Sequence, residues 1–234
     1  MIEVDRHRRR LYVEASDRPA TRDNDHCSVG AAAQLDGRGF SPLYVAYEDF
    51  SAGAGNVLLT ASYDGGATWA TPIQVNDNPS RVDAFQPNLA VAPNGTVTVN
   101  FYDRRLACPA AGTPEAVNAG LALDTVNPNY SGRLPPYGAA NYCVNASIQF
   151  YDPMLTPKGQ NIRLTANTWD PQLNAPHPGS AAGLETFIGD YFGNAVGAGR
   201  GGTLIDYSSV ASTYNDGDNP RNQQQQVVAT IAVP

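Results

Sequence analysis

The feature that most constrains the fold is a hairpin plan that recurs along the chain. In each copy an apolar stretch is followed by a short turn and then by a second apolar stretch that ends in an acidic or hydroxyl residue. The turns carry Gly, Asn or Arg, which suit the positive φ angles or the solvation of a tight antiparallel hairpin. The plan occupies residues 2–17, 31–49, 88–103 and 193–209.

Two of these hairpins are followed by two further strand-like stretches. NVLLTAS and ATPIQV flank the turn YDGGATW, and VNASIQFYD and QNIRLT flank the turn PMLTPKG. Residues 31–77 and 86–166 therefore each predict a four-stranded meander. Four-stranded units that repeat every ~40–50 residues are typical of β-propeller blades. A sandwich of short strands is the competing all-β interpretation, but it does not by itself predict the same hairpin four times.

We therefore predict an all-β fold, a β-propeller of four-stranded antiparallel blades, with about three to four blades in a single domain over residues 1–234. The blades span roughly 1–30 for a partial one, then 31–80, 85–170 and 185–234. The composition favours strands and turns over helices, because the chain has 22 Gly, 18 Pro and 12 Tyr.

Charge and hydropathy exclude several classes of protein. The net charge of −7 argues against a nucleic-acid partner, because phosphate binding needs clustered cations. No stretch approaches the ~18 apolar residues of a membrane span. The charged start MIEVDRHRRR is not followed by an apolar segment, so no signal peptide is predicted in this chain.

The turn at residues 62–69 reads SYDGGATW and matches S-x-D-x-G-x-T-W. It resembles the Asp-box of the sialidase-like superfamily, also called the BNR repeat. Asp64 can accept hydrogen bonds from backbone N–H groups in the turn, and Gly66 permits a positive φ angle. Ser62 and Thr68 can close the turn with their hydroxyls, and Trp69 can bury its ring beneath the hairpin.

The resemblance extends to FQPNLAVAPNGTVTVNFYDRR at 85–105 and FIGDYFGNAV at 187–196, which look like bacterial BNR-repeat proteins. A complete sialidase propeller has six blades, so the resemblance implies a partial, C-terminal piece of a propeller. It implies an exported, extracellular or cell-surface protein whose partner is a glycan or glycoconjugate. An incomplete ring exposes sheet edges, which predicts self-association or pairing with the remaining blades of a longer chain.

Blade topology predicts where a site would lie. The first strands begin, and the second strands end, at the face opposite the Asp-box. The side chains expected there are carboxylates, arginines, tyrosines and one serine: Asp17, Arg18, Glu48, Asp49, Asp103, Arg104, Arg105, Asp190, Tyr191, Tyr207 and Ser208.

The family implies a Tyr nucleophile supported by a Glu, an Asp acid/base and an arginine triad on the sugar carboxylate. By position, the predicted catalytic residues are Tyr191, Asp190 and Asp103. The predicted substrate-binding residues are Arg104, Arg105, Glu48, Asp49 and Tyr207. Two positions depart from the pattern, since Ser208 stands in place of the Glu and Phe85 in place of the first arginine.

Two functions therefore stay open from the sequence. One is a retaining exo-glycosidase of the sialidase type with an incomplete catalytic set in this segment. The other is a non-catalytic propeller that binds carbohydrate or protein. The stretch YDRR at 102–105 also has a structural interpretation, as an ion pair between blades.

The three cysteines, Cys27, Cys108 and Cys143, form no CxxC motif, so no zinc site is predicted. Cys108 and Cys143 flank a Pro-, Gly- and Asn-rich segment and predict either a disulfide or two unrelated buried thiols. No cofactor is assigned, although the Asp-rich loops at 22–27, 75–80 and 214–220 have the oxygen-rich composition that can hold Ca²⁺.

Overall fold

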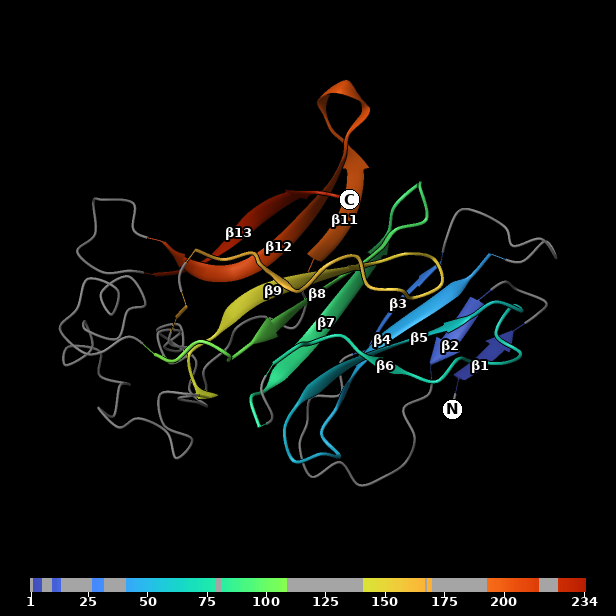
Figure 1. Cartoon of the computed structure of the whole chain (residues 1–234), viewed down its shortest axis with the longest axis horizontal. Coiled ribbons are helices and arrows are strands. Elements are labelled where there is room, and N and C mark those ends of the chain that lie inside the picture. The colour runs from blue at the N-terminus through green and yellow to red at the C-terminus, as the bar shows by residue number, and fades with distance from the viewer. Residues whose placement is uncertain are drawn as a thin grey trace, which may run out of the picture.

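The computed structural model describes residues 2–5, 10–13, 27–31, 41–78, 81–108, 141–166, 168–169, 193–214 and 223–234. Side chains are described from residue 41 onward within these ranges, except at 213–214 and 223–225. Strands dominate this part of the chain and form four antiparallel sheets (Figure 1). No helix within it is long and apolar enough to cross a membrane.

The first sheet pairs β1 (Ile2–Asp5) with β2 (Arg10–Val13). The second runs β3 (Cys27–Ala31), β4 (Leu43–Asp49), β5 (Asn56–Ser62) and β6 (Ile73–Gln74). The third holds β7 (Ala84–Val91), β8 (Val97–Asp103), β9 (Asn145–Tyr151) and β10 (Ile162–Arg163) in that order across the sheet. The fourth holds β11 (Gly193–Ala198), β12 (Leu204–Tyr214) and β13 (Gln223–Ala232).

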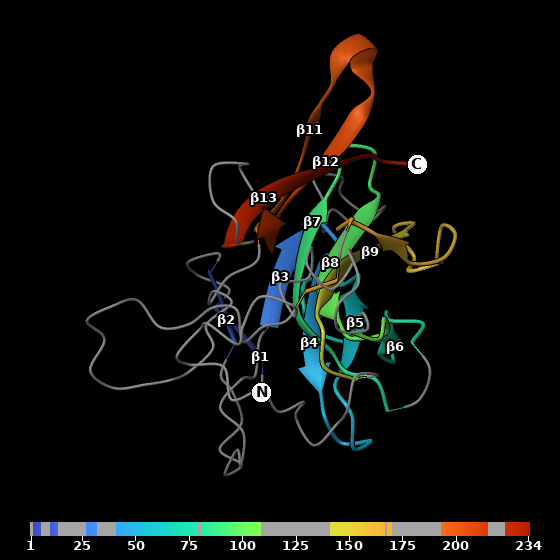
Figure 2. The same cartoon turned by 90° about the vertical axis from the view of Figure 1, so that its left-hand side faces the viewer.

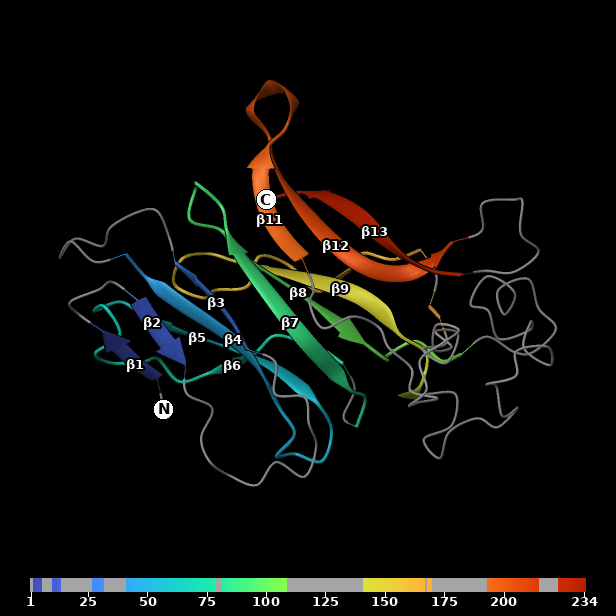
Figure 3. The same ribbon diagram turned by 180° about the vertical axis from the view of Figure 1, so that it is seen from behind.

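The second, third and fourth sheets stack in chain order, as neighbouring blades of a propeller do. Strand β7, the first of its sheet, contacts both β3 and β11, the first strands of the sheets on either side. Figures 2 and 3 show these three strands as successive neighbours. The predicted all-β fold with four-stranded antiparallel blades is confirmed, as a partial propeller.

Two predicted strand bounds are wrong. The strand that pairs with β4 is Cys27–Ala31, with Val29 opposite Val45, and not the stretch that begins at residue 31. The sequence CSVGA contains Cys and Val, whereas AAAQLD is rich in Ala, which strands disfavour. The predicted hairpin at 193–209 is also too short, because β12 continues through the strand-favouring residues VASTY to Tyr214.

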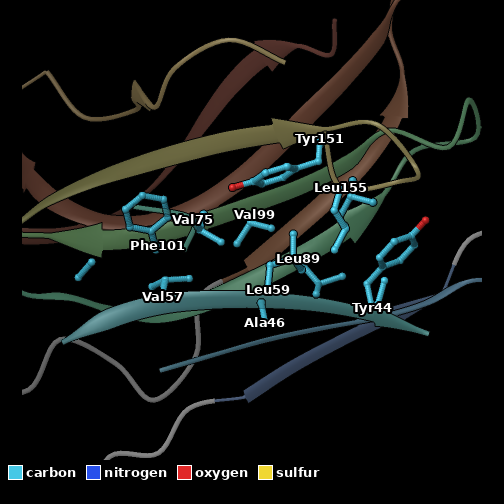
Figure 4. Close-up of a cluster of buried hydrophobic side chains, with 13 residues drawn as sticks. Tyr44, Ala46, Val57, Leu59, Val75, Leu89, Val99, Phe101, Tyr151 and Leu155 are labelled. Atoms are coloured by element: carbon cyan, nitrogen blue, oxygen red, sulfur yellow. The ribbon is translucent and has the colours of Figure 1, made fainter. Parts of the chain in front are cut away.

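The two four-stranded sheets enclose an apolar core that Figure 4 shows. Val97, Val99 and Phe101 of β8 are fully buried in this cluster. They meet Val57 and Leu59 of β5, which are buried to the same extent. Because side chains alternate along a strand, the residues between them on β8 point to the other face.

That other face of β8 packs against the β11–β13 sheet. Tyr102 lies in a second apolar cluster with Trp169, Val210 and Ala211. Its hydroxyl accepts a hydrogen bond of 2.7 Å from the backbone N–H of Ala211. Burial raises the pKa of Tyr102 to about 12, and the hydrogen bond from Ala211 only partly opposes this rise. The sheet that contains β8 is therefore covered on both faces.

Cys108 and Cys143 are joined by a disulfide, with their Cα atoms 5.2 Å apart. The bond links the segment after β8 to the segment before β9, and 35 positions of sequence separate the two cysteines. It therefore closes the longest connection within the third sheet.

We expect Val99→Ala to lower the free energy of unfolding by about 1.5–3 kcal/mol, because it removes two methyl groups from a fully buried side chain. Val228→Ala is the matched control, since Val228 is 63% exposed, and it should change the value by less than about 0.5 kcal/mol. Urea unfolding followed by fluorescence measures both. Equal effects of the two substitutions would contradict the two-sheet core.

We expect a thiol reductant to destabilise the parent protein by about 3–4 kcal/mol, because reduction restores the entropy of a long open loop to the unfolded chain. A double variant with Cys108→Ser and Cys143→Ser should be insensitive to the reductant. Thermal unfolding with and without reductant tests this. If the reductant does not change the melting temperature of the parent protein, the result would argue against the disulfide.

Candidate functional site

The two ends of the sheets carry different chemistry. In the β4–β5 pair, Asp49 lies opposite Asn56, and Leu43 lies opposite Ser62. The turn that follows Ser62 therefore lies at the end of the sheet far from Asp49. We call the end with the 62–69 and 152–158 turns the turn end. The polar end is the opposite one, with Glu48, Asp49, Asp77, Asp83, Asp103, Arg104 and Arg105.

The 62–69 turn at the turn end is organised around one carboxylate. Asp64 accepts hydrogen bonds from the backbone N–H of Thr68 at 2.8 Å and from its hydroxyl at 2.7 Å. The Ser62 hydroxyl donates to Asp64 and accepts from the N–H of Gly66, whose φ angle is +91°. These bonds, that of the Thr68 backbone first, lower the pKa of Asp64 to about 2. Trp69 is half-buried.

The turn between β9 and β10 is also organised around one carboxylate, although its sequence does not match S-x-D-x-G-x-T-W. Asp152 accepts hydrogen bonds from the backbone N–H groups of Met154 and Thr156, at 2.9 and 2.8 Å. The hydroxyls of Tyr44 and Tyr63 both donate to the carbonyl oxygen of Pro153, each at 2.9 Å. The turn end is therefore a hydrogen-bonded seam between two neighbouring sheets.

At the polar end, Asp103 has no exposed surface. Its oxygens accept hydrogen bonds from Asn145 Nδ2 at 2.7 Å, from Ser147 Oγ at 2.8 Å, and from Nε and the backbone N–H of Arg105 at 2.8 and 3.1 Å. A carboxylate with this many donors and no open surface cannot reach a glycosidic oxygen. The geometry gives Asp103 a structural role and does not support the predicted catalytic one.

Arg105 joins two sheets at the same end. Besides Asp103, its guanidinium contacts the carboxylate of Asp77, which follows β6, and the side-chain oxygen of Asn161, which precedes β10. Asp77 also accepts from the backbone N–H of Asn161. The structural interpretation of YDRR, an ion pair between blades, describes Arg105 well. A substrate-binding role for it stays a prediction.

Arg104 is placed differently. Its guanidinium carbon lies 5.3 Å from the centre of the Phe85 ring, and Nη1 lies 3.6 Å from Asp83. The side chains of Arg104 and Asp83 are 23% and 24% exposed. The Phe85 ring also packs against Tyr102, with 5.7 Å between ring centres. Asp83 also accepts hydrogen bonds from the backbone N–H of Gly55 at 2.9 Å and from Asn141 Nδ2 at 3.3 Å. The pair of Arg104 and Asp83 is therefore held in place and partly exposed.

Glu48 and Asp49, both predicted as substrate-binding, have different environments. Glu48 is buried and accepts a hydrogen bond from the backbone N–H of Gln86, which has a φ angle of +51° at a bulge in β7. Asp49 accepts from the N–H and hydroxyl of Ser51 and so caps the turn that follows β4. Glu48 therefore supports β7, and Asp49 supports its own loop.

The remaining predicted site residues divide into two groups. Tyr207 and Ser208 lie in the middle of β12 and not at its end, because the strand continues to Tyr214; this part of the prediction is wrong. Tyr207 is 38% exposed and Ser208 is fully buried. Asp17, Arg18, Asp190 and Tyr191 lie outside the described residues.

Sequence reasoning missed Asp83 and Asn161, and it considered Asp77 only as part of a calcium loop. Asp83 directly precedes β7, the first strand of its sheet. Because site residues are expected at the starts of first strands, this position could have identified Asp83. Of the three Asp-rich loops, the structure describes Cys27, residues 75–78 and Tyr214. Asp77 there pairs with Arg105. Within the described ranges, no group of three His, Cys, Asp or Glu side chains could hold a metal ion.

We expect Asp64→Asn to loosen the 62–69 turn. Because the pKa of Asp64 is lowered from 3.8 to about 2, the carboxylate stabilises the folded state above about pH 4, and this stabilisation is lost as the pH falls toward 2. The difference in urea midpoint between parent and variant should therefore shrink over that interval. A carbon-13 NMR titration that places the Asp64 midpoint near 3.8 would contradict this account.

Neither a scan of protein-family profiles nor a search of curated proteins finds a match. Among solved structures, the chain is similar to the GH93 α-L-arabinofuranosidase of Fusarium graminearum bound to arabinobiose, with a TM-score of 0.40, and to the same enzyme with an iminosugar inhibitor, with a TM-score of 0.37. Sequence identity is 9% in both, over 88% of this chain. The chain spans 50% of the length of those two structures.

Proposed function

We propose that this chain is part of a glycan-acting β-propeller and that it binds glycans at the polar end. The observation that carries the proposal is the partly exposed pair of Arg104 and Asp83 above the Phe85 ring. A guanidinium donor beside a carboxylate acceptor matches neighbouring sugar hydroxyls, each of which both donates and accepts. Packing on Phe85 fixes the guanidinium, so less side-chain entropy is lost on binding.

The charge of this end favours neutral sugars over sialic acids. Among its described residues the carboxylates outnumber the guanidinium groups, and Arg105 already contacts two of those carboxylates. An anionic sugar would be repelled by this surplus, whereas a neutral sugar can donate its hydroxyls to it. The resemblance to sialidases implies an acidic sugar, and so the two classes of glycan are compared directly in the experiment below.

Hydrolysis is the second candidate function. It is supported by the resemblance of GDYFGNAV to the family segment in which a Tyr opens the last blade. In that mechanism Tyr191 would be the nucleophile of a retaining exo-glycosidase, with Asp190 beside it. Asp103 is not part of this proposal, because its carboxylate is enclosed by four donors.

Export to an oxidising environment belongs to the same proposal. Disulfides persist in extracellular and periplasmic proteins and are rare in reducing compartments. The bond between Cys108 and Cys143 supports an extracellular or cell-surface location.

We expect the parent protein to bind neutral glycans on an array, and Arg104→Gln to weaken that binding by about 10- to 100-fold, the loss typical of a charged hydrogen bond. Arg200→Gln is the control, because it makes the same charge change in the turn between β11 and β12, away from the polar end. Isothermal titration with the best neutral and sialylated glycans gives the affinities. Absence of glycan binding by the parent, or equal affinity of Arg104→Gln and the parent, would overturn the proposal.

The catalytic candidate is tested with fluorogenic glycosides, a sialoside included. If Tyr191 is the nucleophile, turnover by the parent should fall by at least about a thousandfold in Tyr191→Phe, while glycan affinity stays within a few fold. If the parent protein binds glycans but does not hydrolyse any of the glycosides, the result would support the binding function and contradict the catalytic one.

A further inference from the structure

A polar cluster lies inside the interface between β8 and the β11–β12 hairpin, away from the polar end. It consists of Thr98 and Asn100 on β8, Asn194 on β11, and Asp206 and Ser208 on β12. Figure 1 shows β12 crossing over the sheet that contains β8 and β9. We propose that this cluster binds a hard metal cation through the side-chain oxygens of Asn100, Asn194 and Asp206.

Strand register brings these side chains together. Thr98 and Asn100 are two positions apart on β8, so they share the face that carries Tyr102 and meets the β11–β13 sheet. On that sheet Asn194 pairs with Ser208, and Asp206 lies two positions before Ser208 on the same face. The three strands therefore direct these polar side chains toward the interface between the two sheets.

Hydrogen bonds fix the cluster on both sides. Asn194 Nδ2 donates to the hydroxyl of Thr98 at 3.0 Å, and Asn100 Nδ2 donates to the carbonyl oxygen of Gly193 at 3.3 Å. The Ser208 hydroxyl donates to Asp206 Oδ1 at 2.6 Å. The side-chain nitrogens of Asn100 and Asn194 are thus both used in hydrogen bonds between strands. Their side-chain oxygens take no part in these bonds.

Three oxygen acceptors stay unmatched. Asn100 Oδ1, Asn194 Oδ1 and Asp206 Oδ2 are buried and have no hydrogen-bond partner among the described residues. Asn100 and Asp206 have no exposed surface at all. A native interior rarely leaves such acceptors unmatched, and here three of them occur in one cluster.

The carboxylate raises the cost of this arrangement. None of the ion pairs in the described part of the chain involves Asp206. A buried ionised carboxylate without a compensating charge is strongly unfavourable, so Asp206 needs either a proton or a cation.

A metal cation meets all of these demands at once. A proton on Asp206 would satisfy two of the three oxygens at most, and a water molecule would bring no charge. Carboxylate and amide oxygens are the ligands that hard cations prefer. Na⁺ balances the single carboxylate, whereas Ca²⁺ usually takes more carboxylates. Bound here, a cation would tie the β11–β13 sheet to its neighbour.

The experiment measures the melting temperature of the chain in NaCl, in CaCl₂ and in choline chloride at equal ionic strength, near pH 7.5. Choline is too large for the cluster and controls for screening. We expect Na⁺ or Ca²⁺ to raise the melting temperature by about 3–6 °C at roughly ten times its dissociation constant, and the two salts identify which cation binds. Equal melting temperatures in all three salts would overturn the proposal.

Asp206→Asn removes the charge with little change in shape and should abolish the cation-dependent shift. Asp49→Asn is the matched control, because Asp49 only caps an exposed turn, and it should retain the shift. If Asp206→Asn keeps the full shift, the cation binds elsewhere and the proposal fails.

A second variant keeps the test decisive if Asp206→Asn does not fold. Asn194→Asp places another carboxylate in the cluster, so it should melt lower than the parent in choline chloride and recover in CaCl₂ by more degrees than the parent does. A variant that responds to CaCl₂ no more than the parent would count against the site.

Discussion

The two-sided burial of β8 is the constraint on which the rest of the structure depends. Its odd-numbered residues from Val97 to Phe101 fill the core against the β3–β6 sheet, and the even-numbered ones meet the β11–β13 sheet. A strand covered on both faces cannot shift its register by one residue without exchanging two interfaces. This fixes which face of the middle sheet meets each neighbouring sheet, and it also fixes where the ends of β8 lie.

That fixed stacking explains why the two ends of the sheets differ. At the turn end, the Asp64 and Asp152 carboxylates satisfy backbone N–H groups in their own turns, and two tyrosines donate to one carbonyl oxygen between the sheets. At the polar end, Asp103 holds Arg105, and Arg105 in turn joins its sheet to Asp77 of the neighbouring sheet. The side chains best placed to contact a ligand are then the partly exposed pair of Arg104 and Asp83.

Much of the fold could be predicted from the chain itself, since alternation and turn residues are local signals. The antiparallel pairing of β4 with β5 and the carboxylate-centred turn at 62–69 follow from such signals. The start of β3 and the end of β12 did not, because the contacts that extend a strand come from its neighbours. The sequence placed Asp103, Arg104 and Arg105 at one end of their strand, but their partners Asp83, Asp77 and Asn161 come from distant segments.

The sequence by itself determined the all-β class, the antiparallel hairpins and the separation of the 62–69 turn from the ends of β4 and β8, because each depends on residues close together in the chain. Only the tertiary structure decided which polar residues are structural and which face solvent. Asp103 and Arg104 are neighbours in sequence, yet one is enclosed by four donors and the other lies partly open above Phe85. The physical reason is that burial and pairing of a charge are set by side chains that other strands bring to it.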